Sequence, residues 1–226
     1  MKPLYRRIID ISYHHQLTHI GSCLSAVDLI DAVYQVKRPQ DKFILSCGHA
    51  ALGLYCVLEK YFKADAEALL EKHGVHPNRD ELIDYSTGSL GHGIGAAVGM
   101  ALANPDIKVY CIVSDGEMME GSVWEALRVA SDYNVKNLKV VGNFNGWGAY
   151  RAIDKDVLIP RIGAFGWGVL PLGGHGIHTL PEKLRIWHDD TPIFIACKTT
   201  VDLYPFLKGQ NAHYVKMTEA DYAQVI

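Results

Sequence analysis

The chain has 226 residues and a formal net charge of −3, with 22 Lys and Arg against 25 Asp and Glu. The charge balance and the lack of a dense basic run argue against a nucleic-acid-binding surface. A hydrophobic content of 49% is sufficient for the core of one α/β domain spanning residues 1–226. No stretch is apolar enough for a signal peptide or membrane span, and the five scattered cysteines form no Cys-x-x-Cys pair, so we expect a cytoplasmic protein without membrane contact, zinc or disulfides.

The first part of the chain predicts helices on either side of one short strand. Residues 4–15 have the pattern of an amphipathic helix, and a second helix is expected to begin at Ser25 as its N-cap. Residues 43–46 are short and apolar, as expected of a buried strand, and are followed by a turn and by a helix over residues 50–61. A polar residue, His49, lies in that turn.

A glycine-rich turn over residues 86–93 follows a predicted short helix over residues 64–73. The turn leads into residues 94–103, whose many small side chains predict a tightly packed helix. Because backbone N–H groups at a helix start attract anions, this turn is a candidate phosphate cradle.

Two apolar runs, residues 109–113 and 138–141, flank a predicted helix. A strand–helix–strand unit makes the two strands parallel neighbours through a right-handed crossover. Their carboxyl ends then lie at the same edge of the sheet, where open α/β sheets bind ligands. We therefore expect Asp115 and Asn145, which follow the two strands, to lie side by side.

The remainder continues the alternation, with a helix ending near residue 165, a strand over 167–170, a helix over 180–188 and a strand over 192–197. Residues 199–216 read as a loop that carries His213, and a terminal helix begins at Glu219. Alternating strands and helices predict an α/β fold with a parallel sheet and helices on both faces.

The junctions carry the candidate chemistry. Asp115, Asn145 and the carbonyl of Trp147 offer the hard oxygen ligands that Mg²⁺ prefers, and Gly116 permits a tight turn. The alternative is that the asparagines only turn and cap the chain. Glu120 lies at the start of the next helix, where the helix dipole alone can explain a carboxylate.

Four loop histidines form the second candidate group. Each lies near a predicted strand end or glycine turn, so together they could converge on one ligand, binding its hydroxyls or moving protons. The alternative is that each is simply solvated. The four are His19, His49, His76 and His213.

Taken together, these motifs resemble the thiamine-diphosphate-binding half of transketolase, especially of two-chain transketolases. The resemblance covers nearly the whole sequence, with departures at Ser114, where the family has glycine, and at Asn143, where it has an acid. The segments that carry it are THIGSCLS (residues 18–25), DKFILSCGHA (41–50), STGSLG (86–91), SDGEMMEG with WEA (114–121 and 124–126) and NFNG (143–146).

The resemblance implies a thiamine diphosphate-binding fold of the diphosphate-binding (PP) type. Asp115, Asn145 and the Trp147 carbonyl would hold Mg²⁺, or another divalent cation such as Ca²⁺ or Mn²⁺. His19, His49, His76 and His213 would act on the sugar substrate. The residues expected at the cofactor are His49, Gly88, Leu90, Asp115, Gly116, Glu120, Asn145 and His213. The counterpart of Glu120 lies near a subunit interface in the family, so it is not expected to activate the cofactor.

The resemblance also implies a partner. Full-length members have a second domain that binds the aminopyrimidine ring and carries the activating glutamate, and we expect this domain on a separate pyrimidine-domain (C-terminal transketolase) subunit, in a heterotetramer. The chain alone would be inactive, and with its partner it would transfer a two-carbon ketol unit from a ketose to an aldose.

Two other functions stay open: the α subunit of a thiamine-dependent 2-oxo acid decarboxylase or dehydrogenase, and a non-catalytic phosphate-binding module. A nicotinamide-binding enzyme lacks support, because no G-x-G-x-x-G follows the first strand.

Overall fold

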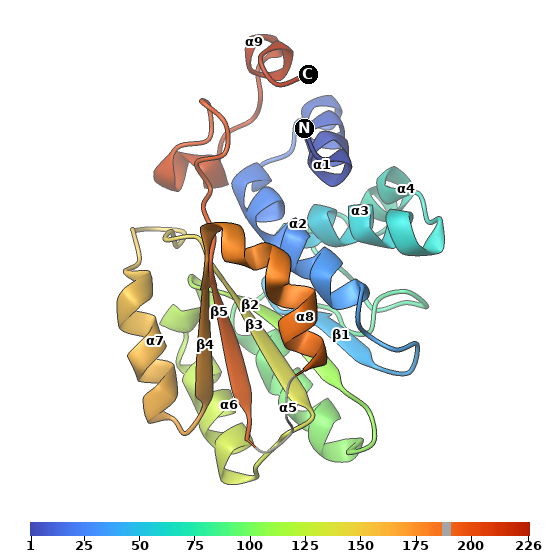
Figure 1. Ribbon diagram of the computed structural model, residues 1–226. Coiled ribbons are helices and arrows are strands. Elements are labelled where there is room, and N and C mark those ends of the chain that lie inside the picture. The colour runs from blue at the N-terminus through green and yellow to red at the C-terminus, as the bar shows by residue number, and fades with distance from the viewer. Residues whose placement is uncertain (187–190) are drawn as a thin grey trace.

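The computed structural model describes residues 1–186 and 191–226 and has a five-stranded parallel sheet at its centre (Figure 1). The strand order is β1-β2-β3-β5-β4, and every neighbouring pair is parallel. The strands are β1 (Lys42–Leu45), β2 (Val109–Ser114), β3 (Leu138–Phe144), β4 (Gly168–Gly173) and β5 (Ile193–Lys198). The predicted α/β class with a parallel sheet is confirmed.

Helices cover both faces of the sheet (Figure 1). On one face lie α1 (Pro3–His14), α2 (Ile20–Tyr34), α3 (Ala51–Phe62) and α8 (Leu180–Arg185), with α4 (Ala66–His73) packed on α3. On the other face lie α5 (His92–Ala103), α6 (Gly121–Asp132) and α7 (Lys155–Ala164). The short elements are η1 (Gly48–Ala50), η2 (Glu117–Met119), η3 (Gly174–Thr179), η4 (Gly209–His213) and the terminal α9 (Glu219–Ala223).

The alternation of side chains along β2 explains the two cores. Tyr110 and Ile112 belong to the core beneath α2 and α3, while Val109, Cys111 and Val113 belong to the core beneath α5 and α6. Successive residues of a strand point to opposite faces, so a strand buried on both faces is a continuous apolar run. This is why the sequence identified the central strands.

The second helix begins six residues earlier than the sequence predicted. His19, in the left-handed conformation with φ 63°, is the N-cap of α2, which begins at Ile20. Ser25 is therefore not an N-cap but a buried residue inside the helix, where its hydroxyl donates to the carbonyl of Ser22 at 3.1 Å. Serine can bond the carbonyl of the preceding turn, so a buried polar contact replaced the expected cap.

The packing expected along residues 94–103 is only partly present. Gly95 and Gly99 face away from the molecule with open space beside them, whereas a Cβ added at Gly93 would lie 2.6 Å from the Cα of Ser46. The close approach is therefore limited to the start of α5, where it meets the end of β1.

The other predicted elements are present with shifted ends. The helix predicted over residues 180–188 ends at Arg185, and its last two predicted residues lie outside the described ones. All five cysteines are buried and free. In residues 1–186 and 191–226, no helix has the length and hydropathy needed to cross a bilayer.

Glycine substitutions in α5 test this packing. We expect Gly93→Ala to lower the free energy of unfolding by about 2 kcal/mol, because the new methyl would meet the backbone of β1. Gly95→Ala in the same helix should raise it by up to about 1 kcal/mol, because alanine favours the helix and meets nothing. Urea denaturation of both variants measures the difference, and equal effects would contradict the proposed contact.

Candidate functional site

The carboxyl ends of β2 and β3 meet at the Asp115 side chain. Asp115 follows β2 and is fully buried. One carboxylate oxygen accepts a hydrogen bond from the backbone N–H of Gly116 at 3.0 Å, and the other accepts from the N–H of Gly146 at 2.5 Å. The expected proximity of Asp115 to the Asn145 turn is therefore present, and its basis is the parallel pairing of Ser114 with Asn143.

Two asparagines occupy the end of β3 and both contact α2. The amide nitrogens of Asn143 and Asn145 donate to the hydroxyl of Ser25, at 3.0 and 3.4 Å. The amide oxygen of Asn143 accepts from the Thr199 hydroxyl at 2.6 Å, and that of Asn145 accepts from the N–H of Trp147 at 3.0 Å. The asparagines thus do more than turn the chain, because they bind it to α2.

The charge of Asp115 is poorly compensated within the protein. Burial raises the pKa of its carboxyl to about 7, although hydrogen bonds from Gly146 and Gly116 and the charge of Lys155 act in the opposite direction. None of the ion pairs among the described residues includes Asp115. Because a buried charge is costly unless it is paired or binds a metal, this carboxylate is suited to a cation.

The donor set fits a hard cation. Within the part of the chain that the structure describes, no three His, Cys, Asp or Glu side chains are grouped as metal ligands. One carboxylate with amide and main-chain oxygens is still a suitable partial set for Mg²⁺, which commonly takes its other ligands from water and phosphate oxygens. The residues present therefore fit a cation that shares its coordination with a phosphorylated ligand.

The loop after Asn145 has a defined shape. Gly146 adopts φ +93°, Trp147 forms an antiparallel bridge with Ala152, and the N–H of Gly148 donates to the carbonyl of Arg151 at 2.9 Å. The loop also contacts the segment of His213, since the carbonyl of Ala149 accepts from the side chains of Gln210 and Tyr214, each at 2.8 Å. The loop that carries Trp147 is thus joined to the segment of His213.

The glycine-rich turn lies on the end of β1. The Thr87 hydroxyl donates to the carbonyl of Leu45 at 2.6 Å, and a Cβ at Gly48 would lie 2.8 Å from the backbone nitrogen of Gly88. Gly91 adopts φ +80° and is the N-cap of α5. The turn, which includes Leu90, therefore opens a helix at the same edge as the Asp115 loop.

Glu117 holds this edge together, and it is not among the candidate residues that the sequence motifs indicate. It is fully buried. One oxygen accepts from the Ser46 hydroxyl at 2.6 Å and from the N–H of Gly91 at 2.9 Å, and the other accepts from the N–H of Ser114 at 3.1 Å. Burial raises the pKa of its carboxyl, and these three hydrogen bonds oppose that shift. The sequence signal that could have identified Glu117 is its position directly after the Asp115-Gly116 turn.

Glu120, the acid that the sequence analysis did select, is exposed at the N-cap of α6, and its side chain makes no capping hydrogen bond. A Cβ added at Gly91 would lie 2.9 Å from its Cβ, so it borders the glycine-rich turn from outside.

Three of the four predicted histidines form a cluster. The ring centroids of His19 and His213 are 4.4 Å apart, those of His49 and His213 are 5.2 Å apart, and those of His19 and His49 are 5.6 Å apart. The N–H of His19 donates to the carbonyl of His213 at 3.0 Å. The exposed His76 lies beside Gly88, whose added Cβ would be 3.3 Å from the imidazole Cγ.

The cluster favours neutral imidazoles. Burial, followed by the charges of His213, His19 and His76, lowers the pKa of His49 to about 3. Burial and the charges of His213 and His76 lower the pKa of His19 to about 4, and burial also lowers that of His213. Neutral imidazoles can each donate and accept a hydrogen bond, so the cluster is suited to hydroxyl groups.

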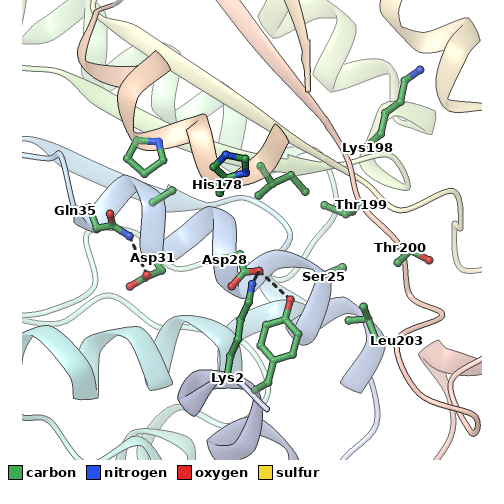
Figure 2. A pocket seen from close by; sticks show the side chains of 14 residues that line it. Lys2, Ser25, Asp28, Asp31, Gln35, His178, Lys198, Thr199, Thr200 and Leu203 are labelled. Carbon is green, nitrogen blue, oxygen red and sulfur yellow. Dashed lines mark hydrogen bonds and ion pairs between the residues drawn. The ribbon is translucent and has the colours of Figure 1, made fainter. Parts of the chain in front are cut away.

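A cavity of about 590 Å³ lies between α2, α8 and the segment after β5, and none of the four histidines lines it (Figure 2). Ser25 and Thr199 line this cavity, and both hydrogen-bond the Asn143 amide. The cavity therefore lies beside the two partners of Asn143. Some of its polar groups are already paired, as Asp28 accepts from Lys2 at 2.7 Å and from the Tyr5 hydroxyl at 2.9 Å. It is separate from the histidine cluster.

Comparison with known proteins shows the family. The model of "Transketolase, thiamine diphosphate binding domain" matches residues 9–225. Human transketolase is 37% identical in an alignment of 190 positions that covers 72% of this chain and 30% of the human protein. A putative uncharacterized transketolase family protein of Sinorhizobium fredii is 32% identical in an alignment of 240 positions that covers 92% of this chain and 86% of that protein.

The solved structures show the same fold at low identity. A mutant transketolase of Pichia stipitis in complex with fructose 6-phosphate has a TM-score of 0.83 at 21% identity, over 96% of this chain and 38% of that one. The transketolase of Leishmania mexicana has a TM-score of 0.78 at 20% identity, over 97% of this chain and 39% of that one. The chain spans about a third of the length of the transketolases it matches.

The lowered histidine pKa values predict acid sensitivity. Below about pH 6.5 the unfolded chain binds protons that folded His49 and His19 refuse, so stability is lost as the pH falls toward the folded pKa values. Between about pH 7 and about pH 5, His49 alone should account for roughly 2 kcal/mol of lost unfolding free energy.

Urea unfolding of the wild type and of His49→Gln at both pH values measures this contribution. The unfolding free energy lost on acidification should be smaller in His49→Gln than in the wild type. It should equal the wild-type loss in His92→Gln, a control that removes an exposed histidine at the start of α5. Equal pH dependence in wild type and His49→Gln would show that His49 is protonated normally.

Proposed function

The chain belongs to the transketolase family and contains its thiamine diphosphate-binding domain, and from this premise we propose that it is the diphosphate- and Mg²⁺-binding subunit of a two-component transketolase. This enzyme would transfer a two-carbon ketol unit from a ketose to an aldose. The observation that carries the proposal is the buried, poorly compensated carboxylate of Asp115 at the ligand-binding edge of the sheet, with neutral histidines at the same edge.

In this proposal, Asp115, Asn145 and the main-chain carbonyl of Trp147 hold the divalent cation, which is Mg²⁺ or, in its place, Ca²⁺ or Mn²⁺. The support is the hard-oxygen character of these groups and the loop geometry that fixes Trp147. Gly116 lets the chain turn beside the diphosphate.

The glycine-rich turn serves the cofactor's diphosphate end. Gly88 and Leu90 lie on the turn that opens α5, where backbone N–H groups favour an anion. His49 and His213 complete the cofactor side, and Glu120 lies at its outer border. Bound thiamine diphosphate supplies the carbon nucleophile and electron sink needed to cleave a C–C bond beside a carbonyl, and the protein supplies position and electrostatics.

The histidine cluster would bind the sugar. Neutral His19, His49 and His213 can donate to and accept from sugar hydroxyls, and they can pass protons between the substrate oxygens. His76 would contact the sugar from the exposed side of the turn. These roles are suited to polyhydroxylated substrates rather than to small 2-oxo acids, so we favour transketolase over the decarboxylase alternative.

We propose that a separate pyrimidine-domain subunit completes the enzyme as a heterotetramer. The Sinorhizobium relative supports this, because 86% of its length matches this one domain and it therefore lacks room for a second of similar size. Five buried free cysteines are compatible with a cytoplasmic location, where thiols stay reduced. The non-catalytic alternative is less favoured, because a module without a cation has no evident use for a buried charge at Asp115.

Substitution of Asp115 tests the cation site. We expect Asp115→Ala to weaken Mg²⁺-dependent thiamine diphosphate binding at least about 10-fold, because it removes the only charged ligand of the proposed set. Titration calorimetry of the chain with its partner subunit, with Mg²⁺ and with EDTA, measures the loss. Asp132→Ala, which removes an exposed carboxylate of α6, is the matched control. Affinity unchanged in Asp115→Ala would exclude this cation site.

Substrate choice tests the histidine cluster. The complex of both subunits should consume a ketose with an aldose acceptor and should not turn over a 2-oxo acid, while the chain alone should be inactive. His213→Ala should lower kcat/KM for the ketose about 10- to 100-fold, because a neutral donor and acceptor for substrate hydroxyls is lost. Turnover of a 2-oxo acid in place of a ketose would favour the decarboxylase alternative.

A further inference from the structure

The hydroxyl of Ser25 is shared by the two asparagines at the end of β3. Ser25 lies within α2, is 5% exposed, and receives hydrogen bonds from the amide nitrogens of Asn143 and Asn145. We propose that Ser25 is a positioning residue of the cation site, which fixes the orientation of the Asn145 amide so that its oxygen faces the cation. This inference rests on the proposed function, because it assumes that Asn145 is a ligand.

The direction of each hydrogen bond follows from the inventory of donors and acceptors. A serine hydroxyl has one hydrogen to donate and two lone pairs that accept. The carbonyl of Ser22, 3.1 Å away, can only accept, so it takes the Ser25 hydrogen. Only the lone pairs remain for the asparagines, so both amides must present their NH₂ groups to Ser25.

Asn143 uses this arrangement to bind two segments together. With its NH₂ group on Ser25, its oxygen points to the Thr199 hydroxyl and accepts from it at 2.6 Å. Asn143 is 1% exposed, and its amide bridges α2 to the segment after β5. A carboxylate at this position could not donate to Ser25. The need for one donor and one acceptor therefore explains why residue 143 is an asparagine.

Asn145 uses the same arrangement to present an oxygen. With its NH₂ group toward Ser25, its oxygen lies on the side of the Trp147 N–H, from which it accepts at 3.0 Å. A rotated amide would offer the cation an NH₂ group, which cannot be a ligand. Partners of this kind orient metal ligands and typically change metal affinity about 10- to 100-fold when removed.

The cavity beside Ser25 sets what removal of the hydroxyl would do. Ser25 and Thr199 both line this cavity of about 590 Å³ (Figure 2), so water can replace a missing hydroxyl. Water donates as readily as it accepts and therefore bonds either end of an amide. Ser25→Ala should thus loosen the orientation of Asn145, which the Trp147 N–H alone would then hold, without leaving the amide nitrogen unsatisfied. The cation site should weaken rather than collapse.

Mn²⁺ is the probe for the test. The free ion is followed by its electron paramagnetic resonance signal, as Mn²⁺ is titrated into the chain with its partner subunit and thiamine diphosphate. We expect Ser25→Ala to weaken Mn²⁺ binding about 10- to 100-fold. Ser25→Thr, which keeps the hydroxyl, should stay within about 3-fold of the wild type by the same reasoning. Ser12→Ala, which removes a buried hydroxyl of α1 without a hydrogen-bond partner among the described residues, should change nothing.

A second arm separates orientation from general damage. In an Asn145→Asp background the ligand has oxygens on both sides, so there is no orientation to fix, and adding Ser25→Ala should weaken Mn²⁺ binding less than about 3-fold. An equal loss in both backgrounds would overturn the positioning role. If Ser25→Ala does not fold, Ser25→Cys, a near-isosteric and much weaker acceptor, replaces it with the same expected direction.

The outcomes also separate this inference from the proposed function. Wild-type affinity in Ser25→Ala, together with lost binding in Asp115→Ala, overturns the role of Ser25 alone. Wild-type affinity in Asp115→Ala as well removes the cation site, and the inference with it.

Discussion

The hydrogen bond from the Gly146 N–H to the buried Asp115 carboxylate, 2.5 Å long, is the contact on which the rest of the site depends. It joins the loop after β2 to the loop after β3 at the edge where both strands end. Burial disfavours the charged form of this carboxyl and raises its pKa to about 7. A buried carboxylate of this kind is suited to a cation, and the match to the family's thiamine diphosphate-binding domain supports the proposal of a cation there.

Helix α2 links the proposed cation site to the histidine cluster. Its N-cap, His19, donates to the carbonyl of His213, and one turn later the Ser22 hydroxyl lies 3.3 Å from Nδ1 of His213. Another turn on, Ser25 holds both asparagines. A single rigid element therefore sets the position of the proposed sugar-binding and cation-binding groups, so a shift of α2 would move both together.

Glu117 has the corresponding role on the other side of the sheet edge. Its three hydrogen bonds join the end of β1, the N-cap of α5 and the end of β2. The close approach of Gly93 to Ser46 strengthens the same junction. The glycine-rich turn and the Asp115 loop are thus fixed to each other by a buried carboxylate that itself touches no proposed ligand group.

The sequence by itself determined the parallel sheet and the meeting of Asp115 with the turn after β3. It also predicted that four loop histidines could converge, and three of them form the cluster. It could do so because strands buried on both faces are continuous apolar runs, and because parallel strands place their carboxyl ends together. Only the tertiary structure decided that Glu117 is buried while Glu120 is exposed, that Ser25 lies inside a helix, and that Gly95 faces outward. Each of these depends on which distant segments meet, as Ser46, Gly91 and Ser114 do at Glu117, and a local pattern of residues holds no information about such contacts.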